Sequence, residues 1–252
     1  MKKKKRIWII NQFACTPDMP GSSRHNEIAS FFVKKDFKVD VFASDYNLSR
    51  RKFLRLTNIE FVKKEIIDGV NWYWLKTFPY EINNWKRYIN LLSFCFNLFV
   101  FMIYRFLICL KNNYLPDLII ASSPQLMSSF CGLILAKFFN KPFIFEVRDL
   151  WPQVLIDLGG MDPESILIRV LKFIENILYK EADYVILLAE GAKKYVKKRG
   201  AENVIWLPNG PDLEKFKCTP RSYSSEKFNN NNLFTVIYAG AHGKANDLDN
   251  VI

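Results

Sequence analysis

The sequence predicts an α/β domain with a largely parallel sheet, because strand-like and helix-like segments alternate along its 252 residues. Half of the residues are hydrophobic, which is sufficient for a large buried core. One short apolar run ends abruptly in Arg148-Asp149. Side chains that follow a strand in such sheets lie at the carboxyl edge, where ligands bind. The sequence therefore predicts helices on both faces of a sheet and a site along one edge.

The order of the elements follows from hydrophobic runs and turn signals. Residues 6–10 are predicted as a buried first strand, and residues 24–35 as a helix capped by Ser22 or Ser23. Asp68-Gly69 between two apolar runs predicts a hairpin. Further strands are expected at residues 38–43, 59–66, 70–77, 117–121, 143–147, 184–188 and 204–207. Further helices are expected at residues 125–139, 163–180 and 191–199.

A change of composition late in the chain predicts a domain boundary. Residues 1–216 are expected to form an N-terminal Rossmann-like domain, and the polar stretch 217–232 a linker. Residues 233–252 are expected to be the opening strand and turn of a second Rossmann-like domain. One strand and part of a helix cannot bury a core, so we expect this second domain to be truncated here.

Charge and composition narrow the classes of function. The net charge of +11 favours an anionic partner. Five scattered cysteines without a CxxC pair, and only two histidines, predict neither a zinc site nor a disulfide framework. The basic start precedes an apolar run too short for a signal peptide, which predicts a cytoplasmic chain. The aromatic residues are not interleaved with basic ones, so no nucleic-acid partner is expected.

Residues 91–110 form an apolar run with one Asn and one Arg, long enough to span a bilayer. Three interpretations are open: a spanning helix, a buried helix, and a helix lying on the membrane surface. Arg105 in lipid would cost about 2.5–3.5 kcal/mol, and a spanning helix would split the sheet. We favour the surface helix, against acidic headgroups. Its expected membrane contacts are Lys86, Arg87, Phe94, Phe99, Phe101 and Phe106.

Two segments are the main candidates for chemistry. Arg148 and Asp149 follow a strand and are followed by Trp151-Pro152; the alternative is a salt-bridged loop. Gly21 lies in the first strand-to-helix turn, where it permits close backbone approach beside a helix N-terminus that attracts anions. The alternative there is a helix cap with an exposed Arg. This turn lacks GxGxxG, so a nicotinamide-binding fingerprint is not supported.

Three further positions carry weaker signals. His25 lies on the first turn of a predicted helix, where a surface polar role is the alternative. His242 follows the last predicted strand in a turn of small residues, which either approaches a phosphate or is a simple βα loop. Glu190 opens a helix, where it favours the helix dipole; we prefer this structural role. The turn at residues 207–212 marks the end of the domain.

Taken together, these segments resemble a family-4 retaining glycosyltransferase of the GT-B fold. The resemblance is closest to the bacterial branch that builds O-antigen, other lipopolysaccharide parts, capsule and exopolysaccharide. The matching segments follow the family's order over nearly the whole chain: residues 7–12, 21–25, 145–153 with 158–160, 182–183, 190–192, 208–212 with 216, and 238–243.

This resemblance implies an enzyme of class EC 2.4 with two Rossmann-like domains and an active site between them. The first domain holds the acceptor, typically a sugar on a polyprenyl diphosphate at the inner face of the plasma membrane. The second holds the nucleotide-sugar donor. The family needs no metal or other cofactor. We therefore expect a peripheral protein at an acidic membrane surface that transfers a sugar to a lipid-linked acceptor.

The resemblance also assigns site residues. Arg148 and Asp149 are the expected catalytic residues, with Arg148 on a phosphate and Asp149 on a sugar or acceptor hydroxyl. Many relatives carry a His near this strand end, so the role of that His is not transferred to Arg148. The expected substrate-binding residues are Gly21, Ser22, Arg24, His25, Glu190, Asn209, Gly240, His242 and Gly243.

The family's donor-binding elements, a basic residue and a Glu-x7-Glu segment, would lie beyond Ile252. This chain alone is therefore expected to be inactive. The alternative function is a non-catalytic membrane-associated remnant, or half of a split enzyme whose partner is a separate donor-domain chain. A different nucleotide-sugar enzyme of similar fold, such as an epimerase, would need a cluster of acid–base residues that two histidines do not provide.

Overall fold

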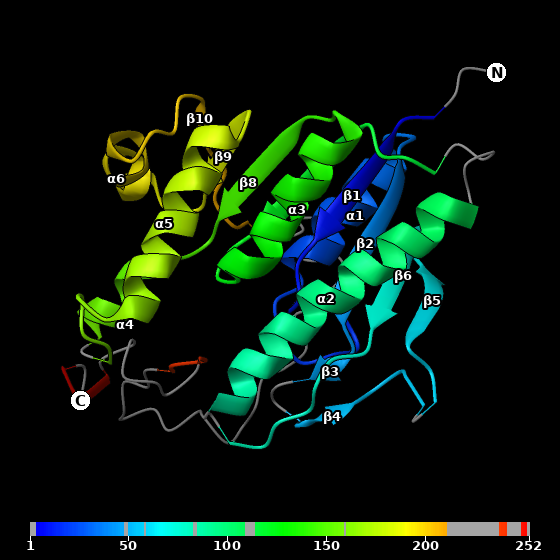
Figure 1. The fold of residues 1–252 in the computed structure, drawn as a ribbon, viewed down its shortest axis with the longest axis horizontal. Coiled ribbons are helices and arrows are strands. Elements are labelled where there is room, and N and C mark those ends of the chain that lie inside the picture. The colour runs from blue at the N-terminus through cyan, green and yellow to red at the C-terminus, as the bar shows by residue number, and fades with distance from the viewer. Residues whose placement is uncertain are drawn as a thin grey trace, which may run out of the picture.

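The computed structural model shows one twisted sheet with helices on both faces (Figure 1). It describes residues 4–47, 50–57, 59–82, 85–108, 114–158, 160–210, 237–240 and 248–250. The predicted linker at residues 217–232 lies outside the described residues, as does most of the predicted second domain. The structure therefore bears on the predicted N-terminal domain.

The sheet has eight strands in the order β10-β9-β8-β7-β1-β2-β6-β5. All neighbouring strands run parallel except β5 and β6, which form the antiparallel hairpin expected around Asp68-Gly69. The predicted α/β class with a parallel-rich sheet is confirmed. The strands are β1 (Arg6–Ile10), β2 (Lys38–Ser44), β5 (Val62–Ile67), β6 (Val70–Leu75), β7 (Leu118–Ser122), β8 (Phe143–Val147), β9 (Tyr184–Leu187) and β10 (Val204–Trp206).

The helices divide between the two faces of the sheet (Figure 1). On one face α1 (Arg24–Lys34) packs on β2 and β6. On the other face lie α2 (Trp85–Ile108), α3 (Leu126–Phe139) and α5 (Ile166–Glu181). Three short elements were not predicted from the sequence: α4 (Gln153–Asp157) and the paired strands β3 (Tyr46–Asn47) and β4 (Lys52–Phe53). The last short elements are η1 (Glu190–Ala192), α6 (Lys193–Lys198) and η4 (Leu248–Asn250).

A hydrophobic core lies on each side of the sheet, and β1 contributes side chains to both cores. Ile7 and Ile9 join the cluster under α1, whereas Trp8 and Ile10 join the cluster under α2, α3 and α5. Successive side chains of a strand point to opposite faces, so a strand covered on both faces is apolar throughout. This explains why β1 appears in the sequence as an uninterrupted apolar run.

Helix α2 is long and apolar enough to cross a membrane by length and composition. In the structure it packs on the domain, with Phe94, Leu98 and Met102 buried in the core. Its one Arg, Arg105, lies against the ring of Tyr73, with 4.7 Å between the guanidinium carbon and the ring centroid. This packing argues against the spanning interpretation, because the helix completes one layer of the folded domain.

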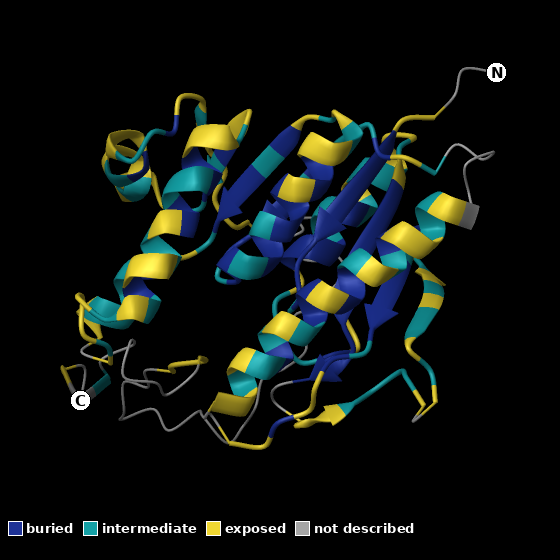
Figure 2. Ribbon diagram, in the orientation of Figure 1, coloured by how far each residue is buried: buried dark blue, intermediate teal, exposed yellow. Residues whose placement is uncertain are grey.

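The outer face of α2 carries a row of exposed apolar side chains. Figure 2 shows exposed positions that recur along this helix. We call this set the α2 stripe: Leu92, Phe96, Val100, Ile103 and Leu107. The spacing of three or four residues puts these side chains on one face of the helix.

The expected membrane contacts on α2 need correction. Phe94 is fully buried, so its side chain does not lie on the exposed face. Phe99, Phe101 and Phe106 are half-buried, and the first two pack against the core. These positions were predicted from residue type alone, whereas the helical repeat exposes Phe96 and the other residues of the α2 stripe. The basic contacts differ from each other: Lys86 is exposed, and Arg87 is half-buried.

Candidate functional site

A cleft of about 360 Å³ lies at the carboxyl ends of β1, β2, β7 and β8. It is lined by the loop that follows β1, the end of β2, Arg87, Pro124 and the turn after β8. Ligands bind at this edge in open α/β sheets. Four predicted site residues line the cleft together: Gly21, Ser22, Arg148 and Asp149.

The turn after β8 is held by one buried hydroxyl. Ser123 Oγ accepts hydrogen bonds from the backbone amides of Arg148 and Asp149, at 2.8 and 3.2 Å. The same hydroxyl donates to the Asp149 carbonyl oxygen at 3.2 Å. The backbone of the turn is therefore fixed independently of its two charged side chains.

The side chain of Arg148 is half-buried, and its Nε is buried without a hydrogen-bond partner among the described residues. Asp149 is exposed, and no ion pair joins the two side chains. The salt-bridged loop is thus not what the structure shows. A buried donor without a partner is costly, so this guanidinium is suited to bind an anion in the cleft.

The loop opposite Arg148 depends on a glycine. Gly21 has a φ of +149°, and a Cβ built there would lie 2.6 Å from Cys15 Sγ. Burial raises the pKa of the Cys15 thiol, with Arg148 opposing that shift, so Cys15 presents a neutral wall. The loop leads into the N-terminus of α1, and the free backbone amides of a helix N-terminus attract anions.

Substitution of Gly21 by alanine is expected to lower the free energy of unfolding by about 1–3 kcal/mol, because the new side chain meets Cys15 in a strained conformation. In a domain of this size that corresponds to a fall in Tm of about 2–12 °C, which thermal unfolding would measure. The control is Gly191→Ala, since no atom lies within 4 Å of a Cβ at that position. Equal Tm values for the two variants would contradict the strained-loop account.

Arg24 lies beneath the cleft and is fully engaged within the fold. Its Nε donates to Glu146 Oε1 at 2.8 Å, and its Nη1 to Asn209 Oδ1 at 3.0 Å. Its Nη2 donates to the Leu207 carbonyl at 3.1 Å. Arg24 is buried, so the alternative of an exposed Arg on a helix cap is wrong. The contacts made by Arg24 and Asn209 join α1 to the segment after β10, and neither residue lines the cleft.

His25 is also buried and does not line the cleft. Its Nε2 lies 2.7 Å from Ser122 Oγ and 3.6 Å from Glu146 Oε2. Burial by itself would raise the pKa of Glu146, but His25 and Arg24 outweigh it and lower that pKa to about 2. Glu146 is therefore an ionised carboxylate under the floor of the cleft, and it holds the first turn of α1 in place.

A chain of buried amides, which sequence reasoning missed, positions the other wall. Gln12 Nε2 donates to Asn90 Oδ1 at 2.7 Å, and Gln125 Nε2 donates to Gln12 Oε1 at 2.9 Å. Asn90 Nδ2 in turn donates to the Phe78 carbonyl at 2.6 Å. These contacts fix α2 against the loop after β1, and Arg87 lies nearly one helical turn before Asn90. The available signal was a pair of amides, Asn90 and Asn97, in a mainly apolar helix.

The remaining predicted residues lie elsewhere. Glu190 is exposed in η1 and does not line the cleft, and Gly240 is exposed. His242 and Gly243 lie outside the described residues. Within the described part of the chain, no three His, Cys, Asp or Glu side chains are grouped so that they could hold a metal ion.

Comparison with known proteins identifies the fold. No protein-family model and no curated protein matches the chain. Sucrose-phosphate synthase from Thermosynechococcus elongatus matches with a TM-score of 0.53 and 15% identity, over 84% of this chain and 93% of that one. Arabidopsis thaliana UGT89C1, solved with UDP, matches with a TM-score of 0.50 and 13% identity, over 83% of this chain and 49% of that one.

Anabaena HepE in complex with UDP-glucose matches with a TM-score of 0.46 and 13% identity, over 83% of this chain and 45% of that one. The chain thus spans about half the length of UGT89C1 and HepE. The matches to sucrose-phosphate synthase and UGT89C1, with TM-scores of 0.53 and 0.50, are informative about the fold. The chain has the α/β Rossmann-like fold that forms one half of GT-B glycosyltransferases.

Proposed function

We propose that this chain is the acceptor-side domain of a retaining glycosyltransferase of the family-4 type. It moves a sugar from a nucleotide-sugar donor to a lipid-linked saccharide during synthesis of a cell-surface polysaccharide such as O-antigen or capsule. The observation that carries the proposal is the cleft in which the Gly21 loop, Arg148 and Asp149 meet, in a domain with half of the GT-B fold.

The chemistry of this cleft supports the proposal. A guanidinium with a free buried donor is suited to the oxygens of a diphosphate, and an exposed carboxylate is suited to sugar hydroxyls. During the proposed sugar transfer, Arg148 and the N-terminus of α1 stabilise the negative charge of the donor's diphosphate. Asp149 orients a hydroxyl of the sugar or the acceptor. The UDP in the UGT89C1 structure is consistent with a nucleoside diphosphate as the donor's leaving group.

The proposed place of action is the inner face of the plasma membrane. The α2 stripe is apolar and exposed, and Lys86 lies near its start. An apolar helix face beside basic residues binds the headgroup region of a bilayer, especially one with acidic lipids. The net charge of +11 adds to this attraction. The domain would thus hold its cleft close to a lipid-linked acceptor.

Replacement of Phe96 by glutamate is expected to weaken binding to vesicles about tenfold or more, because it removes an apolar contact and adds a repelled charge. Co-sedimentation with phosphatidylglycerol-containing vesicles would measure this. The control is Phe31→Glu, since Phe31 is 55% exposed on α1, which covers the opposite face of the sheet. Equal loss of binding in both variants would show that charge alone, and not the α2 stripe, governs membrane binding.

The transferase proposal is tested with the native protein in membranes from its own cells. The membranes are incubated with a panel of nucleotide sugars and saccharides on polyprenyl diphosphate, and the anomeric configuration of the product is determined by NMR. The expected result is transfer with retention. Inversion would overturn the family-4 assignment. If no sugar is transferred even when a chain with a donor-binding domain is added, the non-catalytic alternative replaces the proposal.

A further inference from the structure

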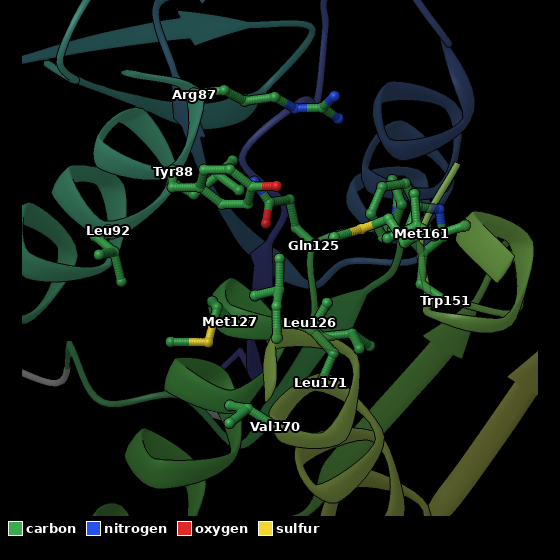
Figure 3. Close-up of a pocket in the computed structure, with 14 residues that line it drawn as sticks. Arg87, Tyr88, Leu92, Gln125, Leu126, Met127, Trp151, Met161, Val170 and Leu171 are labelled. Atoms are coloured by element: carbon green, nitrogen blue, oxygen red, sulfur yellow. The ribbon is translucent and has the colours of Figure 1, made fainter. Parts of the chain in front are cut away.

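A second cavity, of about 480 Å³, lies between the start of α2, the start of α3 and α5 (Figure 3). Its size falls within the range of about 300–1,000 Å³ that small-molecule sites occupy. The lining is mainly apolar and aromatic, and includes Tyr88, Leu92, Met127, Trp151, Val170 and Leu171. The cavity borders the core through Leu126, and the mechanism proposed above does not use it.

The apolar cavity and the polar cleft share two lining residues, Arg87 and Pro124. Figure 3 shows Arg87 at one end of the apolar cavity, with Met127 and Val170 farther along it. The structure records no ion pair or hydrogen bond for the Arg87 guanidinium among the described residues. Within the described part of the chain, Arg87 thus has no carboxylate partner, and its charge lies where the apolar space meets the polar space.

The apolar cavity is also continuous with the α2 stripe. Leu92 belongs to both, and Tyr88, which lines the cavity, is exposed one turn earlier on the same helix. Three environments consequently follow one another along the surface: an apolar cavity beside the exposed stripe, a cation, and the cleft with Arg148 and Asp149. An occupant that matches all three has a hydrocarbon chain, an anionic group and a hydroxyl-rich head, in that order.

We propose that this cavity binds the part of the acceptor's prenyl chain nearest its diphosphate. Arg87 contacts the diphosphate, and the sugar reaches the cleft beside Arg148 and Asp149. The inference rests on the proposed transferase function and names the acceptor's binding site. It commits to a prenyl diphosphate because the proposed acceptor carries one and matches both features of the site. A neutral lipid would make no ion pair with Arg87, and inorganic diphosphate would leave the apolar cavity empty.

Titration of the purified protein with farnesyl diphosphate, below its critical micelle concentration, tests this site without the transfer reaction. Val170 lines the cavity and is partly exposed, so Val170→Trp places an indole ring in the cavity. This variant is expected to bind farnesyl diphosphate at least tenfold more weakly. The control is Phe173→Trp, because Phe173 is exposed on the same helix and does not line the cavity. Equal affinity in the Val170→Trp variant and the wild type would overturn the cavity assignment.

Comparison of farnesyl diphosphate with farnesol, which lacks the diphosphate, tests the role of Arg87. Arg87→Ala is expected to weaken the binding of farnesyl diphosphate about tenfold and to leave the weaker binding of farnesol unchanged. The control for loss of one charge is Lys194→Ala, on α6 and exposed. Equal affinity of the wild type for farnesol and farnesyl diphosphate would overturn the anion contact. Equal binding of lysophosphatidylglycerol would assign the cavity to bilayer lipid and overturn its assignment to the acceptor.

The two proposals fail in different ways. If farnesyl diphosphate binds as expected and no sugar is transferred even when a chain with a donor-binding domain is added, the transferase function is wrong and the lipid site stands. If transfer occurs and Val170→Trp leaves the KM for the lipid-linked acceptor unchanged, the transferase function stands and the cavity assignment is wrong. An increase in that KM at unchanged kcat supports both, since the cavity contributes binding and takes no part in the chemical step.

Discussion

Replacement of Arg148 by alanine, assayed together with a donor-binding domain, is expected to lower kcat/KM for sugar transfer about 100-fold, because one preorganised donor to developing charge contributes about 10²–10³ in rate. Its loss is not expected to unfold the protein. The turn is held by Ser123 through backbone groups, and the buried Nε of Arg148 has no partner among the described residues. A transfer assay and a thermal unfolding curve of the same preparation would separate the two effects.

The conservative variant Arg148→Lys sharpens this test. Lysine keeps the charge and loses the planar pair of donors, so we expect an intermediate loss of about tenfold. Asp149→Asn tests the hydroxyl contact in the same assay. The control is Lys194→Ala, which removes one exposed charge distant from both cavities. Normal turnover of Arg148→Ala and Asp149→Asn would show that neither side chain has the assigned role.

Replacement of Glu146 by alanine is expected to lower the free energy of unfolding by about 3–5 kcal/mol at pH 7. Arg24 and His25 are buried against this carboxylate, and removal of one partner of a buried ion pair leaves the other uncompensated. Urea unfolding would measure the change. The control is Glu164→Gln, an exposed carboxylate without an ion pair among the described residues.

The same carboxylate predicts a pH dependence with a definite sign. The pKa of Glu146 is lowered from its ordinary 4.5 to about 2, because His25 and Arg24 outweigh the effect of burial. Its stabilisation is therefore complete above about pH 4.5 and is lost as the pH falls toward 2, by about 3 kcal/mol in all. Glu146→Gln should lose less stability than the wild type over this interval. An identical loss in both proteins would show that other groups cause the acid sensitivity.

The regular elements were predictable because each one is a local pattern. β1 and β8 have the predicted bounds, since each is a short apolar run bounded by polar or turn residues. The elements that were missed span about one repeat each: β3 and β4 have two residues, and α4 has five, little more than one helical turn. So few residues do not establish a repeat of 2.0 or 3.6, and their conformation depends on the loops around them.

The site was predictable only in part, for a related reason. Strand ends placed Gly21, Ser22, Arg148 and Asp149 at one edge of the sheet, and there they do line one cleft. Arg24 and His25 adjoin Ser22 and Ser23 in sequence, yet they turn beneath the cleft to Glu146. The direction of a side chain in the first helical turn depends on how the whole helix docks, and local sequence does not contain that rotation.

The sequence alone establishes the order of the elements, the parallel sheet and the strand end that carries Arg148, because these depend on neighbours within a few residues. Only the tertiary structure shows that Gln12 meets Asn90, 78 positions away, or that α2 and α5 enclose one cavity. Such contacts depend on the packing of entire layers. Phe94 and Phe96 lie on nearly opposite sides of α2, and the face that this helix turns toward the sheet decides which of them faces solvent.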